Sequence, residues 1–221
     1  GKQFTRAILS AGGTVVALDN NNLEISNFLD NYENEFHKKI IPFECDITSK
    51  QSVSYVLDQV KNKNLKIEGL INNAALNPDY KDENFEGNLL EEFSIEKWNK
   101  EIAVGLTGSL ICTQVFGEEM KKNKKGSIIN ISSDLGLIAP NQTLYSNNQK
   151  KPVTYSVIKH GIIGLTRYVS TYWSEYSIRC NALLPGGVKN KQNKTFIDQI
   201  EQMIPLGRMA SSDDYNGSIV F

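Results

Sequence analysis

Residues that bind metals or form disulfides are scarce in this sequence. Its 221 residues include only three cysteines and two histidines. Cys45, Cys112 and Cys180 lie far apart and are odd in number, and neither His37 nor His160 has a partner at metal-ligand spacing. We therefore expect three reduced cysteines packed as small apolar residues, and no zinc or iron site.

An excess of charge of one sign and long apolar runs are lacking as well. The formal net charge is -1 and the sequence pI is about 6.2, so no basic field draws the chain to nucleic acid or to anionic lipid. No apolar run approaches the roughly 18 residues of a membrane span, and no secretory signal opens the chain. We expect a cytoplasmic protein with a small-molecule partner, and neither nucleic acid nor a membrane as a partner.

What the sequence does contain is a regular alternation of strand and helix patterns. With 40% hydrophobic residues, residues 1–221 can bury one core, so we expect a single domain. Apolar, β-branched runs predict strands, and amphipathic segments predict helices between them. This pattern is typical of βαβ units in a doubly wound, Rossmann-type α/β fold with a parallel sheet. The expected strands are 14–19, 39–47, 67–75, 127–133 and 177–185, and the expected helices begin near residues 2, 49, 94 and 154.

Such sheets bind ligands beyond the carboxyl ends of their strands, where Asp19 is the first polar residue. It follows Gly1 by a spacing close to that of an acidic residue that binds the ribose hydroxyls of a dinucleotide. The next three residues are all Asn, so no positive charge is present to bind a 2′-phosphate. We therefore expect NAD as the cofactor rather than NADP. The glycine-rich phosphate loop is not visible, and Gly1 is its candidate last glycine.

Four motifs in order resemble the short-chain dehydrogenase/reductase family in its single-domain form. They are "NNAA" at 72–75, "GSIINISS" at 126–133, "YSVIK" at 155–159 and "RCNALLPGGV" at 179–188. The resemblance covers essentially the whole chain and implies an NAD-dependent oxidoreductase. Against this family pattern, we expect the chain to lack the first and last strands.

The pair Tyr155 and Lys159 carries the chemistry that this resemblance implies. Residues four apart share one face of a helix, so we expect the ammonium of Lys159 to lower the pKa of Tyr155, making it a general acid or base. Ser133 matches the family's catalytic serine, with Ser132 as the alternative. Both Tyr155 and Lys159 are also expected cofactor contacts. Further cofactor contacts implied by the resemblance are Asp46, Ile47, Asn72, Asn73, Ala74, Ala75, Pro185, Gly186 and Val188.

The chain departs from the family pattern in its long helix and in its loops. Gly105 occupies the place of an Asn that often kinks the helix and holds a water for proton relay. Ala75 replaces a glycine, and Asn190 stands where a Thr is usual. The segment 139–153 is longer than usual and should fold over the site. Together with other segments, it is similar to a branch associated with bacterial surface-sugar and flagellin glycosylation, which favours a polar, sugar-type substrate.

Two alternatives to a simple oxidoreductase stay open. A nucleotide-sugar epimerase or dehydratase shares the fold and the Tyr/Lys pair, and Gly105 raises the possibility of a catalytically silent NAD-binding regulator. We also expect a homodimer or homotetramer, because the two long helices carry aromatic residues beyond one apolar stripe. These residues are Phe116, Tyr168, Tyr172 and Trp173.

Overall fold

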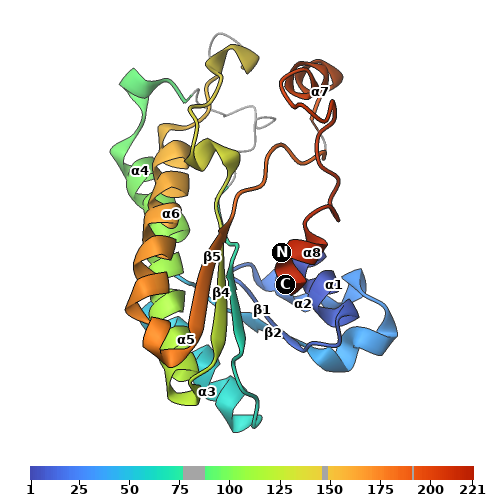
Figure 1. Cartoon of the computed structure of the whole chain (residues 1–221), viewed down its shortest axis with the longest axis vertical. Coiled ribbons are helices and arrows are strands. Elements are labelled where there is room, and N and C mark those ends of the chain that lie inside the picture. The colour runs from blue at the N-terminus through green and yellow to red at the C-terminus, as the bar shows by residue number, and fades with distance from the viewer. Residues whose placement is uncertain (77–87, 146–148, 191) are drawn as a thin grey trace.

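The computed structural model in Figure 1 has the expected alternation of strands and helices. It describes residues 1–76, 88–145, 149–190 and 192–221. Two groups of parallel strands are hydrogen-bonded in the order β1-β2 and β3-β4-β5. The strands are β1 (Val15–Asp19), β2 (Ile40–Glu44), β3 (Gly69–Asn72), β4 (Gly126–Ile131) and β5 (Ile178–Leu183). Four of them lie within the segments predicted from the sequence, and β4 begins one residue before its predicted segment 127–133.

Helices cover both faces of these strands. The long helices α5 and α6 pack on β3, β4 and β5, whereas α1 and α8 pack against each other near the two ends of the chain (Figure 1). Sequence analysis did not predict α2, α7 or α8, which are short. The helices are α1 (Lys2–Ser10), α2 (Asn22–Ser26), α3 (Lys50–Asn62), α4 (Ile95–Ile102), α5 (Ser109–Asn123), α6 (Val153–Tyr172), α7 (Lys194–Glu201) and α8 (Asn216–Val220).

Local sequence explains where the helices begin and end. Ser49 caps α3 by accepting a hydrogen bond from the backbone N–H of Ser52, as the sequence predicted, and Ser94 caps α4 in the same way. Helix α5 ends at Lys124, which adopts the left-handed conformation with a φ of 49°. Gly126, a residue type that would suit this cap, belongs instead to β4.

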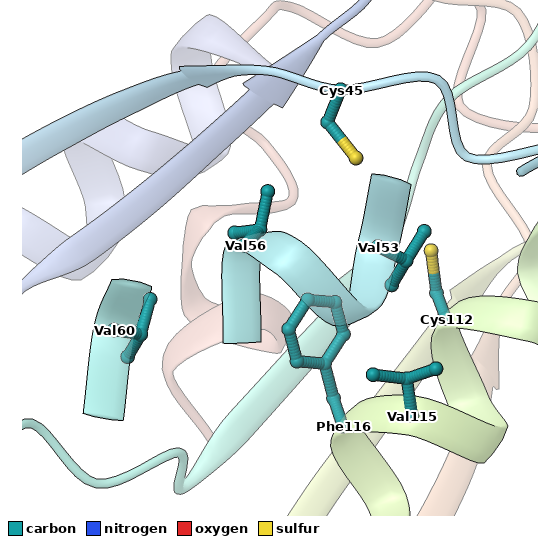
Figure 2. Close-up of a cluster of buried hydrophobic side chains, with 7 residues drawn as sticks. All are labelled: Cys45, Val53, Val56, Val60, Cys112, Val115 and Phe116. Atoms are coloured by element: carbon teal, nitrogen blue, oxygen red, sulfur yellow. The ribbon is translucent and has the colours of Figure 1, made fainter. Parts of the chain in front are cut away.

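One part of the apolar core lies between α3 and α5. Figure 2 shows Val53, Val56 and Val60 of α3 with Cys112, Val115 and Phe116 of α5, and with Cys45 after β2. Burial of such side chains is the main favourable contribution to folding. All three cysteines are buried and free, as expected. Phe116 and Trp173 belong to the core, so their predicted role in subunit contact is wrong.

A row of buried polar side chains fixes how β3, β4, α5 and α6 pack. Asn72 on β3 donates to Oδ1 of Asn130 on β4 at 2.7 Å, and to Oγ1 of Thr113 on α5 at 3.1 Å. Asn130 donates in turn to Oγ1 of Thr166 on α6 at 2.9 Å. Buried amides are costly unless hydrogen-bonded, so this row penalises any other alignment of the four elements.

The long helical stretch contains a π-helical turn at Ala103–Gly108, between α4 and α5. Gly105 lies within this turn, at the position where an Asn kink was expected. A π turn widens and bends a helix locally, and such turns occur frequently at functional sites. The bend is therefore retained without the Asn side chain. Residues 77–87, which the sequence indicated as a polar segment, lie outside the described residues.

Candidate active site

A cavity of about 1000 Å³ opens beyond the carboxyl ends of β3, β4 and β5. This is the edge at which doubly wound sheets bind ligands. The residues that follow these three strands line it, and helix α6 contributes both members of the Tyr/Lys pair. The predicted site residues in its lining are Asn73, Ala75, Ser133, Tyr155, Lys159, Pro185, Gly186 and Val188.

The two serines at the end of β4 have different hydrogen-bond partners. The hydroxyl of Ser132 donates to the backbone oxygen of Lys159 at 2.7 Å, so it fastens α6 to the strand. The hydroxyl of Ser133 donates instead to Oδ1 of Asp134 at 2.7 Å, and it also interacts with the side chain of Tyr155, whose pKa it lowers. Both serines are buried. Ser132 therefore holds the helix, whereas Ser133 contacts the phenol.

Tyr155 and Lys159 lie next to each other on the cavity side of α6. The ammonium nitrogen of Lys159 is 5.6 Å from the centre of the Tyr155 ring and donates to the backbone oxygen of Ile131 at 2.8 Å. An ammonium has three N–H donors, so others remain for ligand hydroxyls. Burial, followed by repulsion from Lys151, lowers the pKa of Lys159 to about 8.

The expected lowering of the Tyr155 pKa is not found in this structure. Burial raises the pKa of Tyr155 above its usual value. The interaction with Ser133 lowers this pKa, but by less than burial raises it, and the negative charge of Asp134 raises it further. Desolvation opposes formation of the phenolate. The phenol is therefore held in its protonated form, ready to donate a proton.

Two charged residues beside this pair were not among the predicted site residues. Lys151 places its ammonium nitrogen 3.7 Å from the centre of the Tyr155 ring, and Asp134 accepts hydrogen bonds from Ser133 and from the backbone N–H of Leu135. Both line the cavity. The signal for Lys151 was present in the sequence, because it precedes Tyr155 by four residues, just as Lys159 follows it by four.

Gly105 also lines the cavity, and Ile158 fills the space beside it. A Cβ added at Gly105 would lie 2.8 Å from Cγ2 and 3.0 Å from Cδ1 of Ile158, closer than carbon atoms pack. The backbone oxygen of Gly105 accepts a hydrogen bond from Ser109 at 3.0 Å. An Asn side chain therefore has no room at this position in the observed packing.

The remaining predicted cofactor contacts lie outside the cavity lining. Gly1, Asp19, Asp46 and Ala74 are exposed. Gly1 begins α1 without a capping side chain and lies close to Asn73, since a Cβ on it would be 3.4 Å from Nδ2 of Asn73.

Asp46 and Ile47, the two predicted contacts that follow β2, both contact other residues of the protein. Asp46 accepts two hydrogen bonds from Thr48. The side chain of Ile47 lies near Gly108, because a Cβ on that glycine would be 2.7 Å from Cδ1 of Ile47. Ile47 is partly buried and packs against the core.

Opposite the predicted residues, the cavity is bounded by α7 and the loop before α6. The rings of Tyr145 and Phe196 are 5.9 Å apart, and Asn141 donates to the sulfur of Met203 at 3.8 Å. Of the polar loop residues expected to bind a sugar, Asn141 and Gln192 line the cavity; Asn148 and Lys191 lie outside the described residues. Sequence analysis missed the apolar part of this wall, which consists of Leu144, Phe196, Ile200, Met203 and Ile204.

In the part of the chain that the structure describes, no three Cys, His, Asp or Glu side chains gather closely enough to hold a metal ion. Within the same residues, no helix has the length and apolar character needed to cross a bilayer.

Known proteins match the chain in both sequence and fold. Residues 1–201 match the family described as short chain dehydrogenase. Post-translational flagellin modification protein A from Campylobacter coli is 32% identical over 222 residues, which cover all of this chain and 85% of that protein.

Two solved structures share the fold over the whole chain. The first is a gluconate 5-dehydrogenase from Burkholderia cenocepacia in complex with NADP and tartrate, with a TM-score of 0.85, 22% identity and 83% of its own chain covered. The second is an NAD+-bound xylitol dehydrogenase, with a TM-score of 0.81, 20% identity and 87% of its chain covered.

Proposed function

Since the chain belongs to the short-chain dehydrogenase/reductase family and is an NAD(P)-dependent oxidoreductase, we propose that it transfers a hydride between NAD(H) and an alcohol or carbonyl group of a small polar substrate. The observation that supports this most directly is the grouping of Ser133, Tyr155 and Lys159 around one cavity at the carboxyl ends of the strands. A catalytically silent regulator would have no need to retain all three groups.

The proton chemistry of the proposed reaction follows from the site. In carbonyl reduction, the protonated phenol of Tyr155 donates its proton to the substrate oxygen. The hydroxyl of Ser133 turns from Asp134 to hydrogen-bond the same oxygen as negative charge develops on it. The positive charge of Lys159 stabilises the phenolate that remains. Alcohol oxidation uses the same groups in reverse, with the phenolate of Tyr155 as the base.

The residues present fit a dinucleotide along the same edge of the sheet. The nicotinamide supplies or accepts the hydride when it is bound. Helix α1 begins at Gly1 without a capping side chain or an acidic residue in its first turn, an arrangement that suits a phosphate group. The free N–H donors of Lys159 suit ribose hydroxyls, and Pro185, Gly186 and Val188 line the cavity where the carboxamide would lie.

We propose NAD rather than NADP as the physiological cofactor. The carboxylate of Asp19 ends β1, and the nearby Lys2 is paired with Glu24 at 2.9 Å. A 2′-phosphate beside Asp19 would meet like charge. Solved relatives bind NADP in one case and NAD+ in another, so this preference requires a direct measurement.

The cofactor preference should depend on Asp19. We expect kcat/KM with NADH to exceed that with NADPH by at least about tenfold, and Asp19→Ser to reduce this ratio by about tenfold, since a hydrogen bond to a charged group is lost. Asp58→Ser, at an exposed position on α3, is the matched control. An Asp19→Ser protein with an unchanged ratio would contradict the assignment.

The two serines at the end of β4 provide the test of the proposed function. NADH consumption is measured with a panel of ketones that includes keto-sugars, and NAD+ reduction with the matching alcohols. For the best substrate, Ser133→Ala should lower kcat by about 10²-fold, the scale of losing one donor to a developing oxyanion. If wild-type protein oxidises or reduces nothing in the panel, the proposed function is unsupported.

Ser132→Ala is the internal control for that experiment. It should lower the free energy of unfolding by about 1–2 kcal/mol, because the buried hydrogen bond to the Lys159 carbonyl is lost. Its effect on kcat should be much smaller than that of Ser133→Ala. Equal losses of kcat in the two variants would refute the assignment of different roles.

A sugar-type substrate is our proposal for the substrate class. Three similar proteins are a flagellin modification protein, a gluconate 5-dehydrogenase and a xylitol dehydrogenase. In this chain, Asn141 and Gln192 bring amide groups to the cavity.

The cytoplasm is our proposed location, because all three cysteines are free and buried.

We also propose that the chain forms a homodimer or homotetramer through α5 and α6. Tyr168 and Tyr172 stack with their ring centres 5.5 Å apart, yet they are 63% and 61% exposed. Paired exposed aromatic rings are typical of subunit contacts. Sedimentation should give at least a dimer at micromolar concentration, and Tyr168→Glu/Tyr172→Glu should shift it toward the monomer. A wild-type monomer would overturn this proposal.

A further inference from the structure

Lys151 is a charged residue of the cavity whose role the proposed mechanism does not explain. Its ammonium lies over the Tyr155 ring at 3.7 Å and makes no hydrogen bond or ion pair with any residue that the structure describes. Burial lowers the pKa of Lys151, and the negative charge of Asp134 raises it by a smaller amount. A cation–π contact compensates only part of the cost of removing an ammonium from water.

The other charged groups that line the cavity all have partners. Arg208 pairs with Asp214 at 2.7 Å, Glu101 accepts a hydrogen bond from Thr154, and Lys159 donates to the backbone oxygen of Ile131. Asp134 accepts from Ser133 and Leu135. Among the described residues of the cavity lining, Lys151 is therefore the one charged side chain without a hydrogen bond or an ion pair.

The backbone of Lys151 is also held in place. The side-chain oxygen of Gln142 accepts from the backbone N–H of Lys151 at 2.9 Å, and its amide nitrogen donates to the Lys151 carbonyl oxygen at 3.5 Å. This two-sided contact joins the loop before α6 to the start of that helix. It orients the lysine toward Tyr155 and not toward solvent, as a binding group requires.

We propose that Lys151 binds an anionic oxygen group, a carboxylate or a phosphate, carried by the carbonyl substrate close to its reacting carbon. The placement follows from the contact with Tyr155, because a substrate whose oxygen lies at the phenol brings its neighbouring atoms to Lys151. The anion supplies the acceptor that the ammonium lacks. This inference rests on the proposed function, and it narrows the substrate to hydroxy or keto acids and to phosphorylated ketones.

Pairs of ketones with and without an anionic group test the proposal. Acetoacetate is compared with acetoacetamide, and dihydroxyacetone phosphate with dihydroxyacetone, which separates a carboxylate from a phosphate. With NADH, we expect kcat/KM for at least one anionic member to exceed that of its neutral partner by at least about tenfold. Lys151→Met should remove most of this preference, and Lys151→Arg should retain it. The neighbouring Lys150, which does not line the cavity, provides the control Lys150→Met.

A binding measurement separates failure of this proposal from failure of the proposed function. Calorimetric titration of the same four ketones into the protein with NAD+ involves no turnover, so it reports binding even if no ketone is reduced. Wild-type protein should bind the preferred anion at least about tenfold more tightly than Lys151→Met. The dissociation constant for NADH should be similar in both, which excludes the cofactor's own phosphates as the anion. Equal affinity of wild type and Lys151→Met for both anionic ketones would refute the proposal.

Discussion

Replacement of Tyr155 by Phe is expected to reduce kcat by about 10²- to 10⁴-fold, the usual contribution of a positioned general acid. The change removes the hydroxyl, its hydrogen bond with Ser133 and the proton to be donated. It keeps the ring over which Lys151 lies at 3.7 Å, so the packing of the site is preserved. Steady-state NADH oxidation with the best ketone measures the loss, and fluorescence titration should show that NADH binding changes little.

Tyr145 provides the comparison for this experiment, because it is another phenol that lines the same cavity and lies near Tyr155. Burial, together with the nearby Tyr155 and Asp134, raises its pKa to about 12, which makes it the weaker acid. Tyr145→Phe should therefore cost much less activity than Tyr155→Phe. If Tyr155→Phe consumes NADH at the wild-type rate, the proposed mechanism is wrong and another group must donate the proton.

The second large effect concerns stability at Gly105. Gly105→Ala should lower the free energy of unfolding by about 1–3 kcal/mol, because the added methyl group overlaps Ile158. Gly164 in α6 is the matched control, since no atom lies within 4 Å of a Cβ placed there. Gly164→Ala should stabilise the protein by about 0.5–1 kcal/mol, as alanine does in a helix. Chemical denaturation with urea measures both changes.

A double-mutant cycle identifies the source of the Gly105 effect. Ile158→Ala removes the overlapping atoms, so adding Gly105→Ala or Gly105→Asn to it should cost less than in the wild type. We expect a coupling energy of about 0.5–3 kcal/mol between the two positions. Strictly additive losses would show that the backbone of the π turn, and not Ile158, requires glycine. Restoring the usual Asn is expected to lower stability without improving turnover.

The fold was readable from the sequence because period-two and helical patterns alternate along the chain. Four strands lie inside their predicted segments, β4 begins one residue early, and α3 begins one residue after the predicted position 49. The short helices α2, α7 and α8 were missed because five to eight residues give too little periodicity to recognise. Phe116 and Trp173 were misassigned because sequence alone does not show which apolar face of a helix meets the core and which meets solvent.

The candidate site was only partly predictable for a different physical reason. Motifs at strand ends identify Ser133, Tyr155 and Lys159 because parallel strands bring their carboxyl ends to one edge. The shift in the Tyr155 pKa was predicted with the wrong sign because it depends on burial, which no motif reports. The role of Ile158 beside Gly105, and the apolar wall from α7, arise from contacts between distant segments.

The hydrogen bond from Ser132 to the Lys159 carbonyl has a consequence for how this protein can acquire new substrates. It attaches the reacting groups to the strand-and-helix scaffold, while the facing wall is joined by side-chain contacts such as Tyr145 with Phe196. Substitutions in that wall can therefore change which ligands fit the cavity without displacing the proton donor. Chemistry and recognition are carried by separate parts of the chain, so the second can diversify while the first is conserved.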